Sequence, residues 1–203
     1  MPGVRWLNQH CKERSKTIMR AMVMPQFGGP DLFEERDVKR PHPGPGETLV
    51  RVVAAGTNPV DAKLGASGDA RGLEAPRILG ADISGVVEEV GAGAAYFAAG
   101  DEVYYTPETS GPGSDGSYAE YHVAKAHIVA KKPASLSHEE AAVPLAGGMA
   151  HEAIVRRLAV RVGETVLIHG GAGGVGSFVL QIAKASGARE GGPEDHKGVK
   201  TPR

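Results

Sequence analysis

Short runs of alternating apolar and polar residues dominate the chain from residue 20 to residue 130. The cleanest run covers residues 47–55, where Leu49 and Val50 begin the two opposite faces of a predicted strand. Turns rich in glycine and proline separate it from the other runs. Such a series predicts an all-β unit that forms a partly closed barrel. Further strands are predicted at residues 21–24, 32–38, 83–90, 102–105 and 118–123.

A short helix is predicted to interrupt these strands at Asn58. Asparagine is a favoured N-cap residue, Pro59 suits the first helical position, and Asp61 stands at the third. Capping alone is a sufficient reason for an asparagine here. Position 58 therefore has a structural interpretation beside any functional one.

Two helices are predicted to follow the strand-rich region. Ser137 and Glu140 have the spacing of a capping box, and Pro144 ends or kinks the helix that they open. A second helix is predicted at about residues 146–158. These signals place one domain at residues 19–135 and the start of another at residues 136–188.

The second domain begins with a strand signal followed by a glycine-rich turn. Residues 165–169 form an apolar, β-branched run, typical of a strand buried on both faces of a parallel sheet. Gly171, Gly173 and Gly176 follow with G-x-G-x-x-G spacing and lead into an amphipathic segment predicted as a helix. Strand, glycine turn and helix in this order indicate a dinucleotide-binding motif. The alternative is a glycine-rich corner without a ligand.

Each glycine of this motif has an expected role. Gly171 permits the tight turn, Gly173 lets the backbone approach a pyrophosphate, and Gly176 lets helix and strand pack closely. Backbone N–H groups at the helix start, including those of Gly174 and Val175, would meet the phosphates at the positive end of the helix dipole. These five residues are the predicted cofactor-binding set of the turn.

Composition and charge exclude several classes of function. The net charge is −1, which gives no reason to expect a nucleic acid or an anionic membrane as partner. No apolar run approaches the roughly 20 residues that span a bilayer. The single cysteine, Cys11, excludes an internal disulfide and a cysteine-rich zinc site. It fits a reducing compartment, so we expect a cytoplasmic protein.

Both ends of the chain depart from the pattern between them. Residues 1–18 are basic and lack the apolar middle of a secretory signal, so a flexible leader is expected. Residues 189–203 contain a single aliphatic side chain, Val199, so no second strand of the domain is predicted there. We expect a disordered tail and a C-terminally truncated domain.

Five segments together resemble the medium-chain dehydrogenase/reductase superfamily, and within it the zinc-free quinone oxidoreductases related to zeta-crystallin. The resemblance implies a mixed β and α/β fold. A GroES-like β-domain would be followed by the first strand–helix unit of an incomplete Rossmann domain, with the nicotinamide in the cleft between them. The segments are residues 19–30, 54–63, 76–87, 100–103 and 143–187.

The resemblance also bears on metal chemistry. Zinc-dependent relatives carry a cysteine in the segment that here reads residues 56–61, and a His-Glu pair where this chain has Ala81 and Asp82. His122 and His127 have no evident partner and are expected to be exposed or to pack. Zinc needs thiolate, imidazole or carboxylate ligands, so we expect no metal.

A metal-free site favours an acceptor that delocalises charge, so the expected substrate is a small quinone or activated enone. The resemblance implies NADPH as the hydride source, with Asn58 beside the nicotinamide and substrate and Asp61 as a weaker catalytic candidate. Lys63 stands where the family often has a tyrosine, and Met149 stands where a threonine is expected.

Two functional hypotheses remain for this chain. One is NADPH-dependent quinone reduction, with a homodimer formed through the Rossmann half where that half is complete. The other is a non-catalytic GroES-like module that binds a partner or dimerises without turnover. Since the predicted strand at residues 165–169 lacks neighbours in this sequence, we expect residues after about 160 to be mobile, to cling to the first domain, or to need a partner chain.

Overall fold

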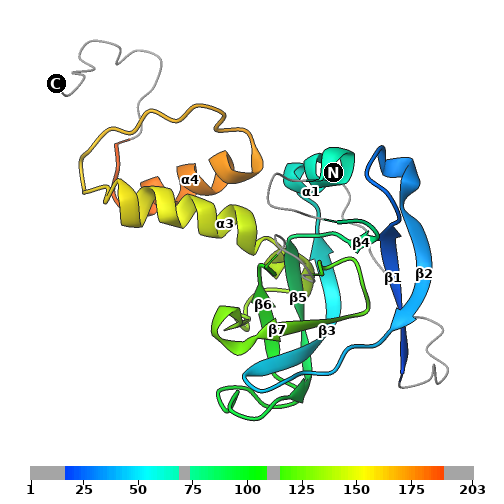
Figure 1. Cartoon of the computed structure of the whole chain (residues 1–203). Coiled ribbons are helices and arrows are strands. Elements are labelled where there is room, and N and C mark those ends of the chain that lie inside the picture. Colours follow the sequence, from blue (N-terminus) through cyan, green and yellow to red (C-terminus); the bar gives the residue numbers. More distant parts are fainter. Residues whose placement is uncertain (1–16, 69–73, 109–114, 190–203) are drawn as a thin grey trace. The chain divides into compact units, whose positions relative to one another are not determined.

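The computed structural model describes residues 17–68, 74–108 and 115–189 (Figure 1). The described residues form two compact units that meet in the sequence between Leu145 and Ala146. Most of the expected leader (residues 1–18) and of the expected tail (residues 189–203) lies outside the described residues.

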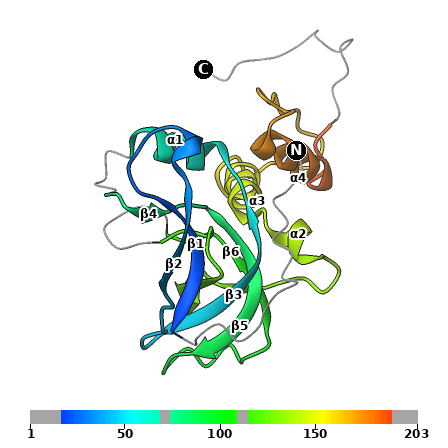
Figure 2. The ribbon, with the colours of Figure 1, turned by 90° about the vertical axis from the view of Figure 1, so that its right-hand side faces the viewer.

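The first unit consists mainly of antiparallel strands in two sheets (Figure 2). The strand order is β2-β1-β4 in the smaller sheet and β7-β3-β5-β6-β8 in the larger one. The strands of the smaller sheet are β1 (Ile18–Met24), β2 (Glu34–Lys39) and β4 (Arg77–Ile78). Those of the larger sheet are β3 (Glu47–Gly56), β5 (Asp82–Val90), β6 (Glu102–Tyr105), β7 (Tyr121–Lys125) and β8 (Ala130–Lys131).

The segment from Tyr118 to Glu120 joins the two sheets. The N–H of Met22 donates to the carbonyl oxygen of Tyr118 at 2.8 Å, and the N–H of Val52 donates to that of Glu120 at 2.9 Å. This segment therefore links β1 of the smaller sheet to β3 of the larger one, and the two sheets stay separate. The mixed fold class with a partly closed β-domain is thus confirmed.

The larger sheet carries the main apolar core of the first unit. Leu49 and Val50 are adjacent in β3 and both fully buried, so this strand is covered on both faces at its start. The core of this sheet also contains Ile83, Val87, Val103, Tyr105, Ala124 and Val129.

Short helices follow strands of the first unit, and helices are the only regular secondary structure among the described residues of the second unit. In α2 the predicted capping box is confirmed, because Glu140 accepts from the Ser137 N–H at 2.8 Å and its own N–H donates to Ser137 Oγ at 3.2 Å. Pro144 opens α3 at a position where a missing N–H does no harm. The helices are η1 (Pro30–Leu32), α1 (Pro59–Ser67), η2 (Ala126–Ile128), α2 (His138–Ala141), α3 (Pro144–His151), the π-helix η3 (Glu152–Arg157) and α4 (Gly174–Ala185).

The second unit is built around a small core between η3 and α4. Helix α4 is amphipathic as predicted: Val179 and Ala183 are buried, whereas Gln181 and Lys184 are exposed. Ala150 of α3 and Ile154 of η3 complete this core.

The strand expected at residues 165–169 does not form, although these residues are described. Val166 and Ile168 pack against the core of the second unit, whereas Leu167 is 76% exposed. A parallel strand is held by hydrogen bonds to neighbouring strands. No strand is present among the described residues of this unit. Residues 166–168 therefore keep the alternation of inward and outward side chains, but they have no neighbouring strand to form backbone hydrogen bonds with. Within the described ranges, no helix is both long and apolar enough to cross a membrane.

Hydrogen exchange tests the difference between the two units. We expect backbone amides of residues 165–168, which lack a hydrogen-bond acceptor among the described residues, to exchange faster than those of Val50 and Ile83 by a factor on the order of 100 or more. Mass spectrometry of pepsin fragments, or NMR, measures this directly. Equal protection in the monomeric protein would contradict the described structure of residues 165–168.

Candidate functional site

The pairing of β3 with β5 creates the polar site of the first unit. It places Gly56, the last residue of β3, opposite Asp82, the first residue of β5. A Cβ at position 56 would lie 2.2 Å from the carbonyl oxygen of Ala142 and 3.0 Å from Asp82, so only glycine allows the three segments to converge. Asn58 follows two residues later as the N-cap of α1.

Asp82 is the centre of this site, with 2% of its surface exposed. Its Oδ2 accepts from the Asn58 Nδ2 at 2.7 Å, and its Oδ1 accepts from the backbone N–H of Leu145 at 2.7 Å. Burial raises the pKa of the Asp82 carboxyl, while these two hydrogen bonds act in the opposite direction. The carboxylate thus holds the starts of two helices, α1 and α3.

Asp61 forms the second buried carboxyl of the site, at 5% exposure. Its Oδ2 accepts from the Asn58 backbone N–H at 2.7 Å and from the Tyr118 hydroxyl at 3.0 Å. Burial is the main cause that raises its pKa, and the nearby Asp82 carboxyl raises it further. The Asp61 N–H donates to the backbone oxygen of Asn58 at 3.0 Å, which fixes the first turn of α1.

The structure therefore brings the two predicted residues Asn58 and Asp61 together and adds two that the sequence did not single out, Asp82 and Tyr118. The Tyr118 hydroxyl reaches Asp61 from the segment that joins the sheets, whereas Lys63, at the position where the family often has a tyrosine, is exposed on α1. The alternation of apolar and polar residues in the sequence predicts strand β5. It does not reveal that Asp82, the first residue of this strand, makes polar contacts.

The glycine turn belongs to the second unit. A Cβ on Gly176 would lie 2.2 Å from the carbonyl oxygen of Gly170, so helix α4 touches the turn through this glycine. The residue with positive φ is Gly170 (φ 73°), which precedes Gly171. The tight turn assigned to Gly171 thus has its left-handed residue one position earlier.

The first turn of α4 presents unpaired backbone donors. Gly173 is its N-cap, without a side-chain hydrogen bond, and the first turn contains no acidic residue. The N–H groups of Gly174, Val175 and Gly176 have no hydrogen-bond acceptor among the described residues. Free N–H groups at the positive end of a helix dipole suit an anionic group, so this turn fits a phosphate-bearing cofactor.

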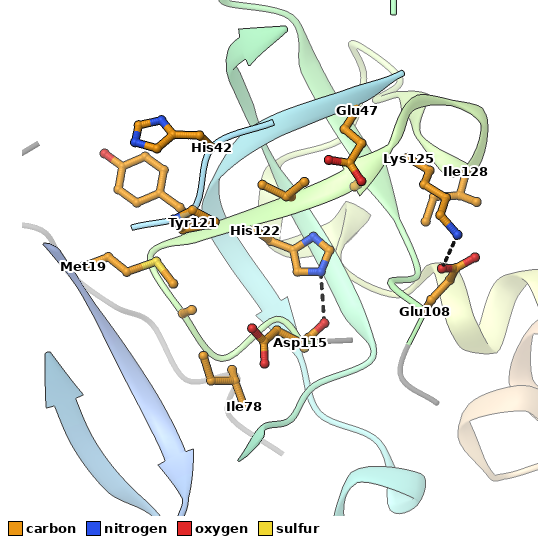
Figure 3. A pocket seen from close by; sticks show the side chains of 15 residues that line it. Met19, His42, Glu47, Ile78, Glu108, Asp115, Tyr121, His122, Lys125 and Ile128 are labelled. Carbon is orange, nitrogen blue, oxygen red and sulfur yellow. Dashed lines mark hydrogen bonds and ion pairs between the residues drawn. The ribbon is translucent and has the colours of Figure 1, made fainter. Parts of the chain in front are cut away.

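A separate hollow of about 430 Å³ lies along β7, and none of Asn58, Asp61 and Asp82 lines it (Figure 3). Lys125 and Glu108 form an ion pair of 2.9 Å on one side of it. His122 also lines the hollow, and Figure 3 shows its contact with Asp115.

His122 is fixed as a neutral packing residue. Its Nε2 donates to the carbonyl oxygen of Asp115 at 3.0 Å, so its Nδ1 accepts from the Tyr105 hydroxyl at 2.9 Å. Burial lowers the pKa of His122 to about 4. With both ring nitrogens engaged, His122 has no lone pair to offer a metal, and His127 is exposed. In the described part of the chain, no three His, Cys, Asp or Glu side chains gather as metal ligands would.

Comparison with known proteins identifies relatives of this chain. The profile described as the alcohol dehydrogenase GroES-like domain matches residues 44–134. Human quinone oxidoreductase is 37% identical over 174 residues, covering 85% of this chain and 51% of that protein. The NADPH-dependent alkenal/one oxidoreductase, chloroplastic, of Arabidopsis thaliana is 38% identical over 173 residues, covering 82% of this chain and 44% of that protein. The chain thus spans about half the length of these curated relatives.

Two solved structures are similar to this chain over most of its length. An alcohol dehydrogenase superfamily protein from Novosphingobium aromaticivorans matches with a TM-score of 0.79 and 42% identity, over 84% of this chain and 52% of that one. Quinone oxidoreductase from Coxiella burnetii matches with a TM-score of 0.76 and 34% identity, over 84% of this chain and 55% of that one. The similarity covers most of the described chain.

Alanine substitutions in the glycine turn test its packing. We expect Gly176→Ala to destabilise the second unit by about 1–3 kcal/mol, because the new methyl group collides with the Gly170 carbonyl. Gly174→Ala is the matched control: a Cβ there meets nothing within 4 Å, so stability should stay within about 1 kcal/mol. Hydrogen exchange of the Val179 and Ala183 amides reports both changes. Equal effects of the two variants would contradict the close approach at Gly176.

The pH dependence of stability tests the state of His122. Because the folded protein holds its pKa at about 4, the unfolded chain takes up a proton first as the pH falls below about 6.5. Stability is therefore full above that pH and falls by up to about 3 kcal/mol toward pH 4. His122→Gln should remove this part of the slope in denaturant titrations. Parallel curves for the two proteins would show that His122 is not held neutral.

Proposed function

We propose that this chain, which belongs to the medium-chain dehydrogenase/reductase superfamily and within it to the quinone oxidoreductases related to zeta-crystallin, serves NADPH-dependent reduction of a quinone or an activated enone. The printed names of the human and Arabidopsis thaliana relatives support this class of reaction. Since the chain matches about half of each relative, the activity of the whole enzyme is part of the proposal.

The observation that carries the proposal is the open first turn of α4. Its unpaired N–H groups at Gly174, Val175 and Gly176, without an acid nearby, are what a pyrophosphate requires. We assign these residues, with Gly171 and Gly173, to the pyrophosphate of NADPH. The bound cofactor supplies the hydride, and the protein binds and orients it.

Asn58 is the proposed polar group beside the nicotinamide and the substrate. Its carboxamide is partly exposed and held at one end by Asp82, so it enters the reaction already oriented. Asp61 is the second proposed catalytic residue, and it positions Asn58 by accepting its backbone N–H.

The proposed reaction uses no metal. Asp82 stands where zinc-dependent relatives place a ligand, but both of its oxygens already accept hydrogen bonds from Asn58 and Leu145. A conjugated acceptor lets the negative charge that develops on oxygen delocalise, so the protein has to stabilise only a small part of it.

A non-catalytic module is the second candidate function. Residues 165–169 form no strand, and Val162 and Leu167 are 85% and 76% exposed. Such apolar side chains favour contact with another protein surface over a finished dinucleotide-binding sheet.

Titration with NADPH, followed by nicotinamide fluorescence, separates the two candidates. The enzymatic proposal predicts a Kd on the order of 1–100 μM and oxidation of NADPH that depends on added quinone. Asn58→Ala should slow that oxidation about tenfold or more, which corresponds to the loss of one good hydrogen bond.

Lys63→Ala, in the same helix but exposed, is the control and should leave the rate unchanged. Absence of NADPH binding up to millimolar concentration would exclude the enzymatic proposal and leave the non-catalytic module.

A further inference from the structure

The two oxygens of Asp82 are engaged by different partners, and this fixes the orientation of the Asn58 side chain. An ionised carboxylate only accepts hydrogen bonds, so the end of the Asn58 carboxamide that faces it at 2.7 Å is the NH₂ group. The amide oxygen of Asn58 is thereby turned away from Asp82. That oxygen faces the first turn of α1 as its N-cap, and its second lone pair is left to accept a hydrogen bond from a bound group.

The contact with Leu145 prevents the arrangement from reversing. Leu145 is the second residue of α3, and its N–H donates to Oδ1 of Asp82 at 2.7 Å. Pro144 before it has no N–H, so this bond is the first that the helix end makes. An acceptor atom must therefore stay at the Oδ1 position, or a backbone donor loses its partner.

We propose that Asp82 is a positioning residue, which holds the Asn58 carboxamide by its NH₂ end and so makes Asn58 a hydrogen-bond acceptor toward the nicotinamide amide. This inference rests on the proposed function and goes beyond it. In it, Asp82 determines whether the amide oxygen or the NH₂ group of Asn58 faces the cofactor.

The isosteric variant Asp82→Asn tests whether Asp82 positions the Asn58 carboxamide. Its side-chain oxygen must remain on the Leu145 N–H, which leaves an NH₂ group facing Asn58. Two NH₂ groups repel, so the Asn58 carboxamide turns over and offers its own NH₂ outward. Residue 58 keeps its identity but changes from acceptor to donor. The variant also removes a buried charge, so the fold is expected to survive.

A double exchange, Asn58→Asp with Asp82→Asn, puts an outward-facing acceptor back at position 58. The new asparagine again accepts from Leu145 with its oxygen and now donates its NH₂ to the carboxylate at position 58. Both hydrogen bonds are restored, and aspartate is as good an N-cap as asparagine. The second carboxylate oxygen at position 58 then faces outward as an acceptor, so the positioning role predicts that NADPH affinity recovers together with stability.

The experiment compares the affinity for NADPH with that for 2′,5′-ADP, which lacks the nicotinamide, by calorimetry. We expect Asp82→Asn to weaken NADPH binding about tenfold and to change 2′,5′-ADP binding less than about twofold. The double exchange should recover both the melting temperature and the affinity for NADPH. Asp101→Asn is the matched control, because Asp101 also accepts one backbone and one side-chain donor, at 3.0 Å and 3.2 Å, but lies outside the site.

Three results would overturn the inference while leaving the proposed function intact. Asp82→Asn could bind NADPH as tightly as the parent protein, it could weaken both ligands equally, or the double exchange could restore the melting temperature without restoring NADPH affinity. A parent chain that binds neither ligand would instead overturn the proposed function, and this inference with it.

Discussion

A buried carboxylate needs a hydrogen-bond donor for each oxygen, and at Asp82 this requirement organises the first unit. The donors come from the N-cap of α1 and from the first turn of α3, so one side chain ties two helix starts to the first residue of β5, the central strand of the large sheet. The register that sets Gly56 opposite Asp82 makes this possible, because only a residue without a side chain leaves room for the backbone at Ala142. The same strand register thus determines both the packing at this end of the sheet and the geometry of the polar site.

The hydrogen bond from Leu145 to Asp82 lies at the sequence boundary between the two units. Helix α3 starts at the Asp82 carboxylate and continues into η3, which supplies Ile154 to the core of the second unit. That core contains few large apolar side chains, each worth about 1.5–3 kcal/mol when fully buried. A segment of this size gains little stability by itself. The glycine turn therefore depends on the close fit of α4 at Gly176 more than on a surrounding sheet.

Features set by neighbours in the sequence were predictable, and features set by distant partners were not. Strand β6, the N-cap at Asn58 and the capping box at Ser137 follow from local pattern and were confirmed. Strand β7 begins at Tyr121, later than expected, because residues 118–120 bond to β1 and β3 instead. Residues 165–169 have the side-chain pattern of a strand, but a strand also needs a partner, which no local pattern reveals. The partners of Asp82 lie 24 and 63 residues away, so its role appears only in the fold.

The most direct test of this account is an NMR titration of the Asp82 carboxyl carbon together with the Asn58 side-chain NH₂ signals. We predict that both move with one midpoint, above the pKa of an ordinary aspartate, because burial favours the neutral acid and the NH₂ group loses its acceptor when Asp82 takes up a proton. NH₂ signals that stay fixed while Asp82 titrates, or an Asp82 that titrates at its ordinary pKa, would contradict the account.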